Sequence, residues 1–398
     1  MKIGLLITTY NRTEYLKECL ESIKRSDLSY LRQVMIVDDC SSDHTIKMIN
    51  DFNPKANTIK HFKKENKGIK DSLLIGCESL FKYGMDIVIN LDGDAIVRND
   101  FINQLYYSYL GGILTGFHCT TKNADGSERH KILESKPTFF IKESVGGINM
   151  CFDKVTYENF IKPALLKPGN WDHEACKLAR KVFCLKESVV QHIGLYSSMG
   201  HEHDRPDVAE DFKSLFLPHT TLIGVDCENA LNESSKNIKF GNVKLLPKMP
   251  SKAEYNKFIL KEFYKFVDTP YLLIVQNDGY ILNWRAWSDD FMRYDYIGAP
   301  WFWYKDGLNV GNGGFSFRSK RLHDMLGTDN KIQPLNDPLI HNFEEDHNIC
   351  RIYRKYLELT YHIRFAPIEV ASKFSIEGYP GKVKYSGQFG FHGYNVIK

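Results

Sequence analysis

Asp92 and Asp94 are the residues of this 398-residue chain whose types and spacing most directly suggest chemistry. The two carboxylates flank Gly93 and follow the apolar run 87–89, which is typical of a buried strand. Carboxylate oxygens are the ligands that hard divalent cations prefer, and a glycine between them lets a diphosphate approach the backbone. The pattern predicts a site where a metal ion neutralises a departing diphosphate, with a solvated turn as the alternative.

Three further polar clusters each follow a predicted strand in the first half of the chain. They are the segment 8–11, the pair Asp38 and Asp39, and His192. The carboxyl ends of parallel strands meet at one edge of a sheet, so these side chains are expected to converge there with Asp92. For His192, a histidine packed under the sheet edge is the alternative interpretation.

The elements that would position these residues alternate between strands and helices. Apolar runs and helical spacing predict strands at 2–8, 33–37, 58–62 and 86–91 and helices at 13–24, 45–52 and 70–83. Such alternation predicts an α/β fold with a doubly wound, mostly parallel sheet.

A polar, charged stretch, residues 197–218, carries Gly200, Pro206 and Pro218, interrupts this alternation and resembles a linker. The cluster His201–Asp204 within it is interpreted as part of a solvated linker rather than as a metal site. A strand at 220–225, a helix at 252–266 and a strand at 271–276 then restart the pattern. We therefore predict two domains, 1–206 and 207–398.

The second half repeats the order of polar features found in the first. Asp278 follows a predicted strand, a glycine-rich loop comes next, then an acidic pair, then a late histidine. The residues concerned are Asp278, Asn312, Gly313, Gly314, Glu345, Asp346 and His392. When the two halves are aligned on the residues that follow Gly279, Asn277 and Gly279 stand where the first half has its two acids. Only the carboxylate of Asp278 is then left, and together with His392 it makes a metal site with fewer ligands.

The blocks Thr8–Arg12, Ile36–Asp43 and Leu91–Asp94 resemble family 2 glycosyltransferases of the GT-A fold, a likeness that covers about residues 1–200. The second half resembles an uncharacterised family of GT-A-like domains found beside glycosyltransferases, on blocks such as Ile274–Gly279 and Val310–Arg318. The resemblance implies two tandem GT-A-like, Rossmann-like domains.

The first resemblance also implies roles for residues. Thr8, Tyr10, Asp38 and Asp39 would hold the base and ribose of a nucleotide sugar. Asp92 would contact the ribose or the metal, Asp94 would bind the metal, and His192 would complete its ligands. The metal implied is Mn²⁺ or Mg²⁺.

An inverting transfer also needs a carboxylate that takes the proton of the acceptor hydroxyl. By the resemblance, Asp172 is the candidate base of the first domain, and Asp346 with Glu345 that of the second. Helix starts favour acids, so a capping or dipole role is the alternative for each. Trp171 is a candidate for stacking on a sugar, or a core aromatic.

In the second domain, Asp278, Asn312, Gly313 and Gly314 are candidates for donor binding, and Asp278 with His392 for a metal. The tryptophans between 284 and 303 suggest a sugar platform or core packing in equal measure.

Composition narrows the class of protein further. The net charge is +3, so nothing requires a nucleic acid partner, and no apolar run approaches the ~20 residues of a membrane span. The nine cysteines are scattered without a C-x-x-C pair, which is typical of reduced thiols rather than of a cysteine-rich zinc site. These features predict a cytoplasmic protein and leave peripheral attraction to a membrane open.

The sequence thus predicts a bifunctional glycosyltransferase that uses UDP-, GDP- or dTDP-sugars on a glycan or glycolipid acceptor. Its N-terminal domain would be metal-dependent and inverting. Two alternatives remain: one active domain joined to a glycan-binding or docking module, and a sugar nucleotidyltransferase. The nucleotidyltransferase is disfavoured because Thr8–Arg12 is not the glycine-rich basic loop that such enzymes carry.

Overall fold

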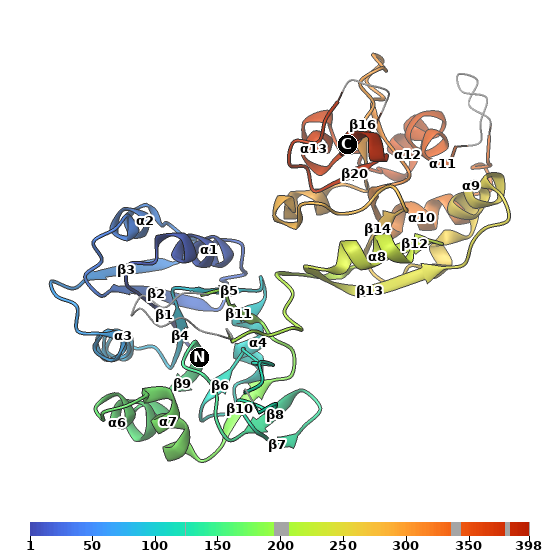
Figure 1. Cartoon of the computed structure of the whole chain (residues 1–398). Coiled ribbons are helices and arrows are strands. Elements are labelled where there is room, and N and C mark those ends of the chain that lie inside the picture. The colour runs from blue at the N-terminus through green and yellow to red at the C-terminus, as the bar shows by residue number, and fades with distance from the viewer. Residues whose placement is uncertain (124, 195–206, 336–343, 379–382, 398) are drawn as a thin grey trace. The chain divides into compact units, whose positions relative to one another are not determined.

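The computed structural model describes all residues except 124, 195–206, 336–343, 379–382 and 398. The chain divides into two compact units, Met1–Ser214 and Leu215–Lys398, which we call the N-terminal and C-terminal units (Figure 1). Among the described residues, no helix combines the length and the apolar character needed to cross a bilayer. The cluster His201–Asp204 and most of the predicted linker before residue 207 lie outside the described residues.

The N-terminal unit is built on a nine-stranded sheet in the order β3-β2-β1-β4-β9-β6-β10-β8-β7. Strands β3, β2, β1 and β4 run parallel, and β9 joins β4 antiparallel. Every residue of β1 is buried, as expected of an apolar strand at the centre of a sheet. Strands β5 and β11 pair with each other in a separate sheet. The strands of the unit are β1 (Ile3–Thr9), β2 (Leu31–Asp38), β3 (Asn57–Phe62), β4 (Ile87–Asp92), β5 (Ala95–Val97), β6 (Leu114–Thr115), β7 (Ile132–Ser135), β8 (Phe139–Lys142), β9 (Asn149–Asp153), β10 (Val182–Leu185) and β11 (Val190–His192).

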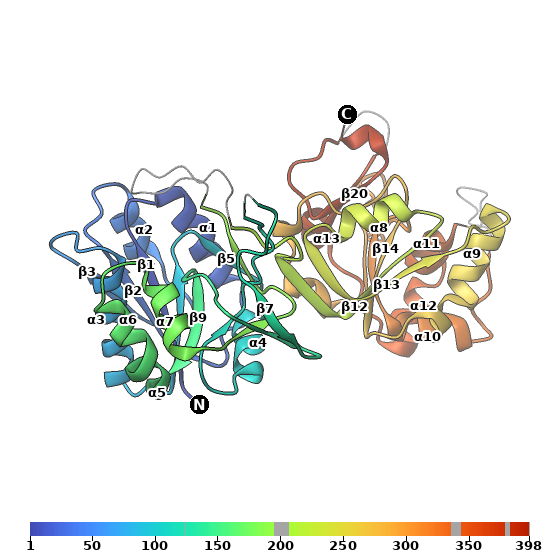
Figure 2. The same cartoon turned by 60° about the horizontal axis from the view of Figure 1, so that its bottom comes forward.

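Helices cover both faces of this sheet. One core cluster joins alternate residues of β1 to α1, α2 and α4, and a second joins the opposite face to α3, α6 and α7 (Figures 1 and 2). The helices are α1 (Thr13–Lys24), α2 (Thr45–Asp51), α3 (Ile69–Lys82), α4 (Phe101–Ser108), α5 (Lys154–Thr156), α6 (Lys162–Leu165) and α7 (Trp171–Ala179). The predicted doubly wound α/β fold is confirmed.

The division between the units falls eight residues later than the predicted boundary at 206/207. Residues 207–214 belong to the N-terminal unit because they bond to it. The carbonyl of Val208 accepts from Thr120 N at 2.8 Å, and Asp211 accepts from Ser188 N at 2.7 Å. This part of the predicted linker is therefore packed structure.

The C-terminal unit has a five-stranded sheet in the order β13-β12-β14-β18-β15. Strands β13, β12 and β14 are parallel and β18 is antiparallel to β14, which repeats the arrangement of β2, β1, β4 and β9. The strands are β12 (Leu215–Val225), β13 (Ile238–Leu246), β14 (Tyr271–Val275), β15 (Tyr296–Ile297), β16 (Ala299–Pro300), β17 (Val310–Gly311), β18 (Ser316–Ser319), β19 (Ser375–Glu377) and β20 (Gly390–His392).

Its helices are α8 (Glu228–Ser235), α9 (Lys252–Lys261), α10 (Lys320–Thr328), α11 (Glu345–His347), α12 (Arg354–Tyr361) and α13 (Ile368–Phe374). The helix predicted at 252–266 ends earlier, at Lys261, and a short 3₁₀ turn follows at Phe263–Phe266. Both units thus have the GT-A-like α/β arrangement that the sequence predicts.

Candidate functional site

In the N-terminal unit, Asp92, Asp94 and His192 meet at the carboxyl end of β4. Strand β11 pairs with β5 so that His192 stands opposite Ala95, and its Nε2 lies 3.1 Å from Asp94 Oδ2. Arg12, from the turn after β1, forms an ion pair with the same carboxylate. The convergence predicted from the strand ends is confirmed, while the binding roles of these residues stay a prediction.

The electrostatics of this acid cluster favour a divalent cation. Burial raises the pKa of Asp92 to about 7, even though His192 and Arg12 oppose the shift. Burial also lowers the pKa of His192, which favours the neutral imidazole that metals bind. Its Nδ1 is buried and has no hydrogen-bond partner among the described residues. Two carboxylates beside an imidazole with a spare nitrogen fit Mn²⁺ or Mg²⁺.

The candidate nucleotide-binding acids differ in what they contact. Asp38 is 1% exposed, and its carboxylate accepts from Ser41 N at 2.9 Å and from Ser41 Oγ at 2.5 Å. Asp39 is paired with Lys63 Nζ at 2.6 Å. The Asp38 carboxylate therefore shapes the turn after β2 while Asp39 contacts Lys63, and binding of a donor by either acid stays a prediction.

Thr8 and Tyr10 come from the end of β1 and the turn after it. The register of β1 and β4 places Thr8 opposite Asp92, and Tyr10 is partly exposed. Thr8 thus lies beside the acid cluster, and the contact of Thr8 and Tyr10 with a nucleotide stays a prediction.

Asp172, in the first turn of α7, is held by two backbone N–H groups. Its Oδ2 accepts from Gly147 N at 3.0 Å and its Oδ1 from His173 N at 2.8 Å. Trp171 is 8% exposed and packs in the core, where a Cβ on Gly147 would meet its ring at 2.7 Å. Of the two interpretations of Trp171, the structure favours a core aromatic, because the indole fills the space behind the loop.

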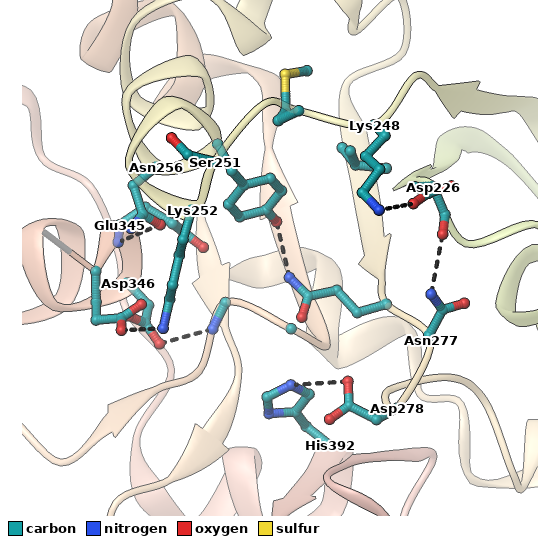
Figure 3. A pocket seen from close by; sticks show the side chains of 17 residues that line it. Asp226, Lys248, Ser251, Lys252, Asn256, Asn277, Asp278, Glu345, Asp346 and His392 are labelled. Carbon is teal, nitrogen blue, oxygen red and sulfur yellow. Dashed lines mark hydrogen bonds and ion pairs between the residues drawn. The ribbon is translucent and has the colours of Figure 1, made fainter. Parts of the chain in front are cut away.

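The C-terminal unit contains a pocket of about 470 Å³ at the carboxyl ends of β12 and β14 (Figure 3). Predicted site residues and residues that the sequence did not single out line it together. Its lining consists of Val225, Asp226, Lys248, Met249, Ser251, Lys252, Tyr255, Asn256, Gln276, Asn277, Asp278, Gly313, Gly314, Glu344, Glu345, Asp346 and His392.

Asp278 and His392 face each other in this pocket, with Nε2 3.5 Å from the carboxylate (Figure 3). The other nitrogen, Nδ1, lies 3.7 Å from Glu377 and 3.1 Å from Asn312 Nδ2. Burial alone lowers the pKa of His392, but the carboxylates of Asp278 and Glu377 raise it to about 9. A protonated imidazole offers no lone pair to a metal, and metal binding by Asp278 and His392 stays a prediction.

Strand register corrects the alignment that the sequence suggested between the two acid clusters. Met150 and Ser316 each lie three positions after the glycine, Gly147 or Gly313, whose N–H bonds the candidate base of its unit, and they pair with Asn90 of β4 and Ile274 of β14. Counting forward, Asp92 corresponds to Gln276 and Asp94 to Asp278, and both second acids contact the late histidine. The C-terminal unit has therefore lost the first acid of the pair and kept the second.

Asp346 reproduces the setting of Asp172. Its Oδ2 accepts from Gly313 N at 3.0 Å and its Oδ1 from His347 N at 2.8 Å. Burial, and then the neighbouring Glu345, raises the pKa of Asp346 to about 6. Each unit thus presents one aspartate bonded in the same way to a glycine-containing loop.

Glu345 is not placed to act as a base. It is 3% exposed, and its two oxygens lie 2.7 and 2.9 Å from the guanidinium nitrogens of Arg318, which is fully buried. The bidentate pair occupies the carboxylate, so the catalytic role predicted for Glu345 is corrected to a positioning role.

The glycine-rich loop 312–314 allows side chains of the protein to pack directly against its backbone. A Cβ on Gly313 would meet Glu345 at 2.0 Å, and one on Gly314 would meet His392 at 2.1 Å. Asn312 is fully buried, and its Oδ1 accepts from Gly314 N at 2.8 Å. Asn312 therefore holds the turn of the glycine-rich loop, the two glycines border the pocket, and binding of a donor by Asn312 stays a prediction.

Sequence reasoning missed the lysines of the pocket. Lys252 begins α9 and pairs with Glu344, and Lys248 lies 3.9 Å from Asp226. Their position just after β13, at the carboxyl edge of the predicted sheet, is the signal that could have identified them.

Together, the two sheets and the aspartates at their carboxyl edges define a pair of GT-A-like units. Residues 5–158 match the family described as "Glycosyl transferase family 2", and residues 239–392 match "Protein of unknown function (DUF5672)". The matches confirm both resemblances, that of the N-terminal unit to family 2 glycosyltransferases and that of the C-terminal unit to an uncharacterised domain family.

Two curated proteins are similar to stretches of this chain. Glycosyltransferase GlyA of Streptococcus pneumoniae is 23% identical over 128 residues, 31% of this chain and 18% of that protein. The poly(ribitol-phosphate) β-N-acetylglucosaminyltransferase TarS of Staphylococcus aureus is 34% identical over 58 residues, 14% of this chain and 10% of TarS. The chain spans less than a fifth of the length of these relatives.

A crystal structure of S. aureus TarS 1-349 in complex with UDP-GlcNAc is similar to part of this chain, and the alignment covers 48% of this chain and 58% of the TarS chain. Its TM-score is 0.37 at 17% identity.

Proposed function

We propose that the chain is a bifunctional glycosyltransferase in which each unit transfers a sugar from a nucleotide-sugar donor to a glycan or glycolipid acceptor. The observation that carries the proposal is the repeated aspartate of the two units. Asp172 and Asp346 accept hydrogen bonds from Gly147 and Gly313 in the same geometry. A carboxylate fixed in this way keeps one face available to a substrate hydroxyl.

In the N-terminal unit, Asp172 acts as general base of an inverting transfer. The acceptor oxygen bonds to the anomeric carbon while Asp172 takes its proton, and the bond to the diphosphate breaks with its electron pair on the leaving oxygen. Asp92, Asp94 and His192 would hold Mn²⁺ or Mg²⁺, which neutralises the leaving diphosphate when bound. Asp39, Thr8 and Tyr10 bind the nucleoside.

In the C-terminal unit, Asp346 takes the acceptor proton and lysines replace the metal. Lys248 and Lys252 line the same pocket as Asp278 and Asp346. Their ammonium groups supply the positive charge that a departing diphosphate requires. The carboxylate pair of a metal site is reduced to Asp278, and that acid is already engaged with His392.

A donor-hydrolysis screen of the full chain tests the proposal. The protein is incubated with UDP-, GDP- and dTDP-sugars, and the released nucleoside diphosphate is measured with and without EDTA. Two donors are expected to be consumed, or one donor in two kinetic phases, of which only one is lost on chelation.

Site variants assign each phase. Asp94→Asn should remove the chelator-sensitive hydrolysis, and Lys248→Ala with Lys252→Ala the insensitive one. Asp290→Asn, an exposed acid outside the described pockets, is the matched control. A single phase that Asp94→Asn removes completely would contradict a catalytic C-terminal unit.

A further inference from the structure

Cys119, His130 and Asp207 form a cluster of ligand-type side chains to which neither the proposed transfer nor the family matches give a role. One ligand atom from each, a thiol sulfur, an imidazole nitrogen and a carboxylate oxygen, lies within 4.8 Å of the other two. Cys119 is 7% exposed, and the other two residues are partly buried. We propose that these three residues bind a zinc ion.

Backbone pairing brings the three together although they are far apart in sequence. Thr120 N donates to the carbonyl of Val208 at 2.8 Å, which sets Asp207 beside Cys119. A short hairpin, in which Lys122 pairs with Glu128, returns the chain so that His130 approaches the same point. The cluster therefore rests on ordered main-chain contacts rather than on a chance approach of surface side chains.

The imidazole of His130 is oriented as in a metal ligand. Its Nδ1 lies 3.0 Å from Ser144 Oγ, whereas its buried Nε2 has no hydrogen-bond partner among the described residues. Metal-binding histidines characteristically use one nitrogen for such a supporting hydrogen bond and the other for the ion. A buried nitrogen left without a partner costs free energy, which a bound cation would recover.

The carboxylate also has a supporting partner. Arg129 forms an ion pair with Oδ1 of Asp207, which leaves the second oxygen for an ion. A thiolate, an imidazole and a carboxylate are the ligand types that zinc accepts, with a fourth position open to water or substrate.

A Cys-His-Asp nucleophile triad is the competing interpretation, and the geometry disfavours it. In a triad, the carboxylate holds the imidazole nitrogen that faces away from the nucleophile. Here Ser144 occupies Nδ1 of His130. Binding of one ion by all three side chains explains the arrangement better.

Cobalt substitution of the full chain tests the site. Metal-free protein is titrated with Co²⁺, and the near-ultraviolet thiolate-to-cobalt charge-transfer band is followed. We expect the band to saturate at about one equivalent, and zinc to displace the cobalt. The acid cluster of Asp92, Asp94 and His192 contains no sulfur, so metal bound there gives no such band.

Three variants locate the ligands. Cys119→Ser should abolish the band, His130→Gln should weaken zinc binding by more than about 100-fold, and Ser144→Ala should weaken it by about 10–100-fold. Cys184→Ser, which removes another buried thiol of the same unit, should keep the band.

If Cys119→Ser does not fold, the cobalt titration of the wild-type protein and the zinc affinity of His130→Gln still test the proposed site. Absence of the band in the wild-type protein, or its persistence in Cys119→Ser, would overturn the proposal. So would unchanged zinc affinity in His130→Gln.

Discussion

The histidines of the two acid clusters have similar positions but different charge states. His192 and His392 occupy equivalent places, each against the second acid of its cluster. Burial lowers the pKa of His192, and its Nδ1 has no partner among the described residues. His392 has carboxylates on both sides, which raise its pKa to about 9. In the N-terminal cluster the cation beside Asp94 is therefore Arg12 and the histidine is neutral, whereas in the C-terminal cluster the histidine itself carries the positive charge.

The residue before each candidate base shows a second difference. Trp171 fills the space behind Gly147 with an indole, and Glu345 fills the equivalent space behind Gly313 with a carboxylate paired to Arg318. Apolar packing and a buried ion pair therefore hold the two aspartates in the same hydrogen-bonded geometry. The comparison suggests that the position of the base is preserved while its support has changed.

Chelation should separate the units most strongly. EDTA is expected to lower the turnover of the N-terminal unit by roughly 10³-fold, because a bound cation contributes several kcal/mol to stabilising the leaving diphosphate. Turnover by the C-terminal unit should change less than about twofold. Donor hydrolysis with EDTA and then with added Mn²⁺ measures both, and equal sensitivity of the two phases would remove the distinction between the histidines.

Breaking the support of Asp346 should affect stability. Glu345→Gln leaves the buried Arg318 without its carboxylate, which is expected to cost about 3–5 kcal/mol. Thermal unfolding of the C-terminal unit should shift downward by on the order of 10 °C. Glu358→Gln, which removes a more exposed ion pair with Arg354, serves as the control and should shift it little. Similar unfolding temperatures for the two variants would show that the ion pair of Glu345 with Arg318 does not stabilise the unit.

The acidity of Asp346 predicts a pH dependence for the C-terminal unit. A raised pKa keeps the carboxyl protonated to higher pH, so the basic form is present above about 6 and is lost as the pH falls below it. Turnover at pH 5 should be about tenfold lower than the plateau. The rate of the chelator-insensitive phase between pH 4.5 and 8 checks this, and a flat profile below pH 6 would exclude Asp346 as the base.

Much of this account could be predicted from local sequence. Apolar runs gave the strands around β1 and β4, and helical spacing predicted α1 at its observed bounds. The meeting of Asp92 with His192 followed from the rule that strand ends share an edge. Such inferences work because they depend on short-range periodicity and on topology.

What could not be predicted depends on contacts between distant residues. The ion pair of Glu345 with Arg318 joins positions 27 apart, and nothing in either local pattern indicates it. The match of Asp278 to Asp94 required strand register, because the residues after Gly279 suggested a different alignment. Cys119, His130 and Asp207 are brought together by backbone pairing that no spacing rule describes.

The most direct test of two catalytic units is the product pattern of two base variants of the full chain. Asp172→Asn and Asp346→Asn each remove a proton acceptor while keeping shape, so turnover of one transfer should fall by about 10²–10⁴-fold with donor affinity preserved. With donors and acceptor supplied, each variant should stop synthesis at a different product, and the two variants mixed should restore the full one. An unchanged product pattern with Asp346→Asn would contradict the account and make the C-terminal unit a binding module.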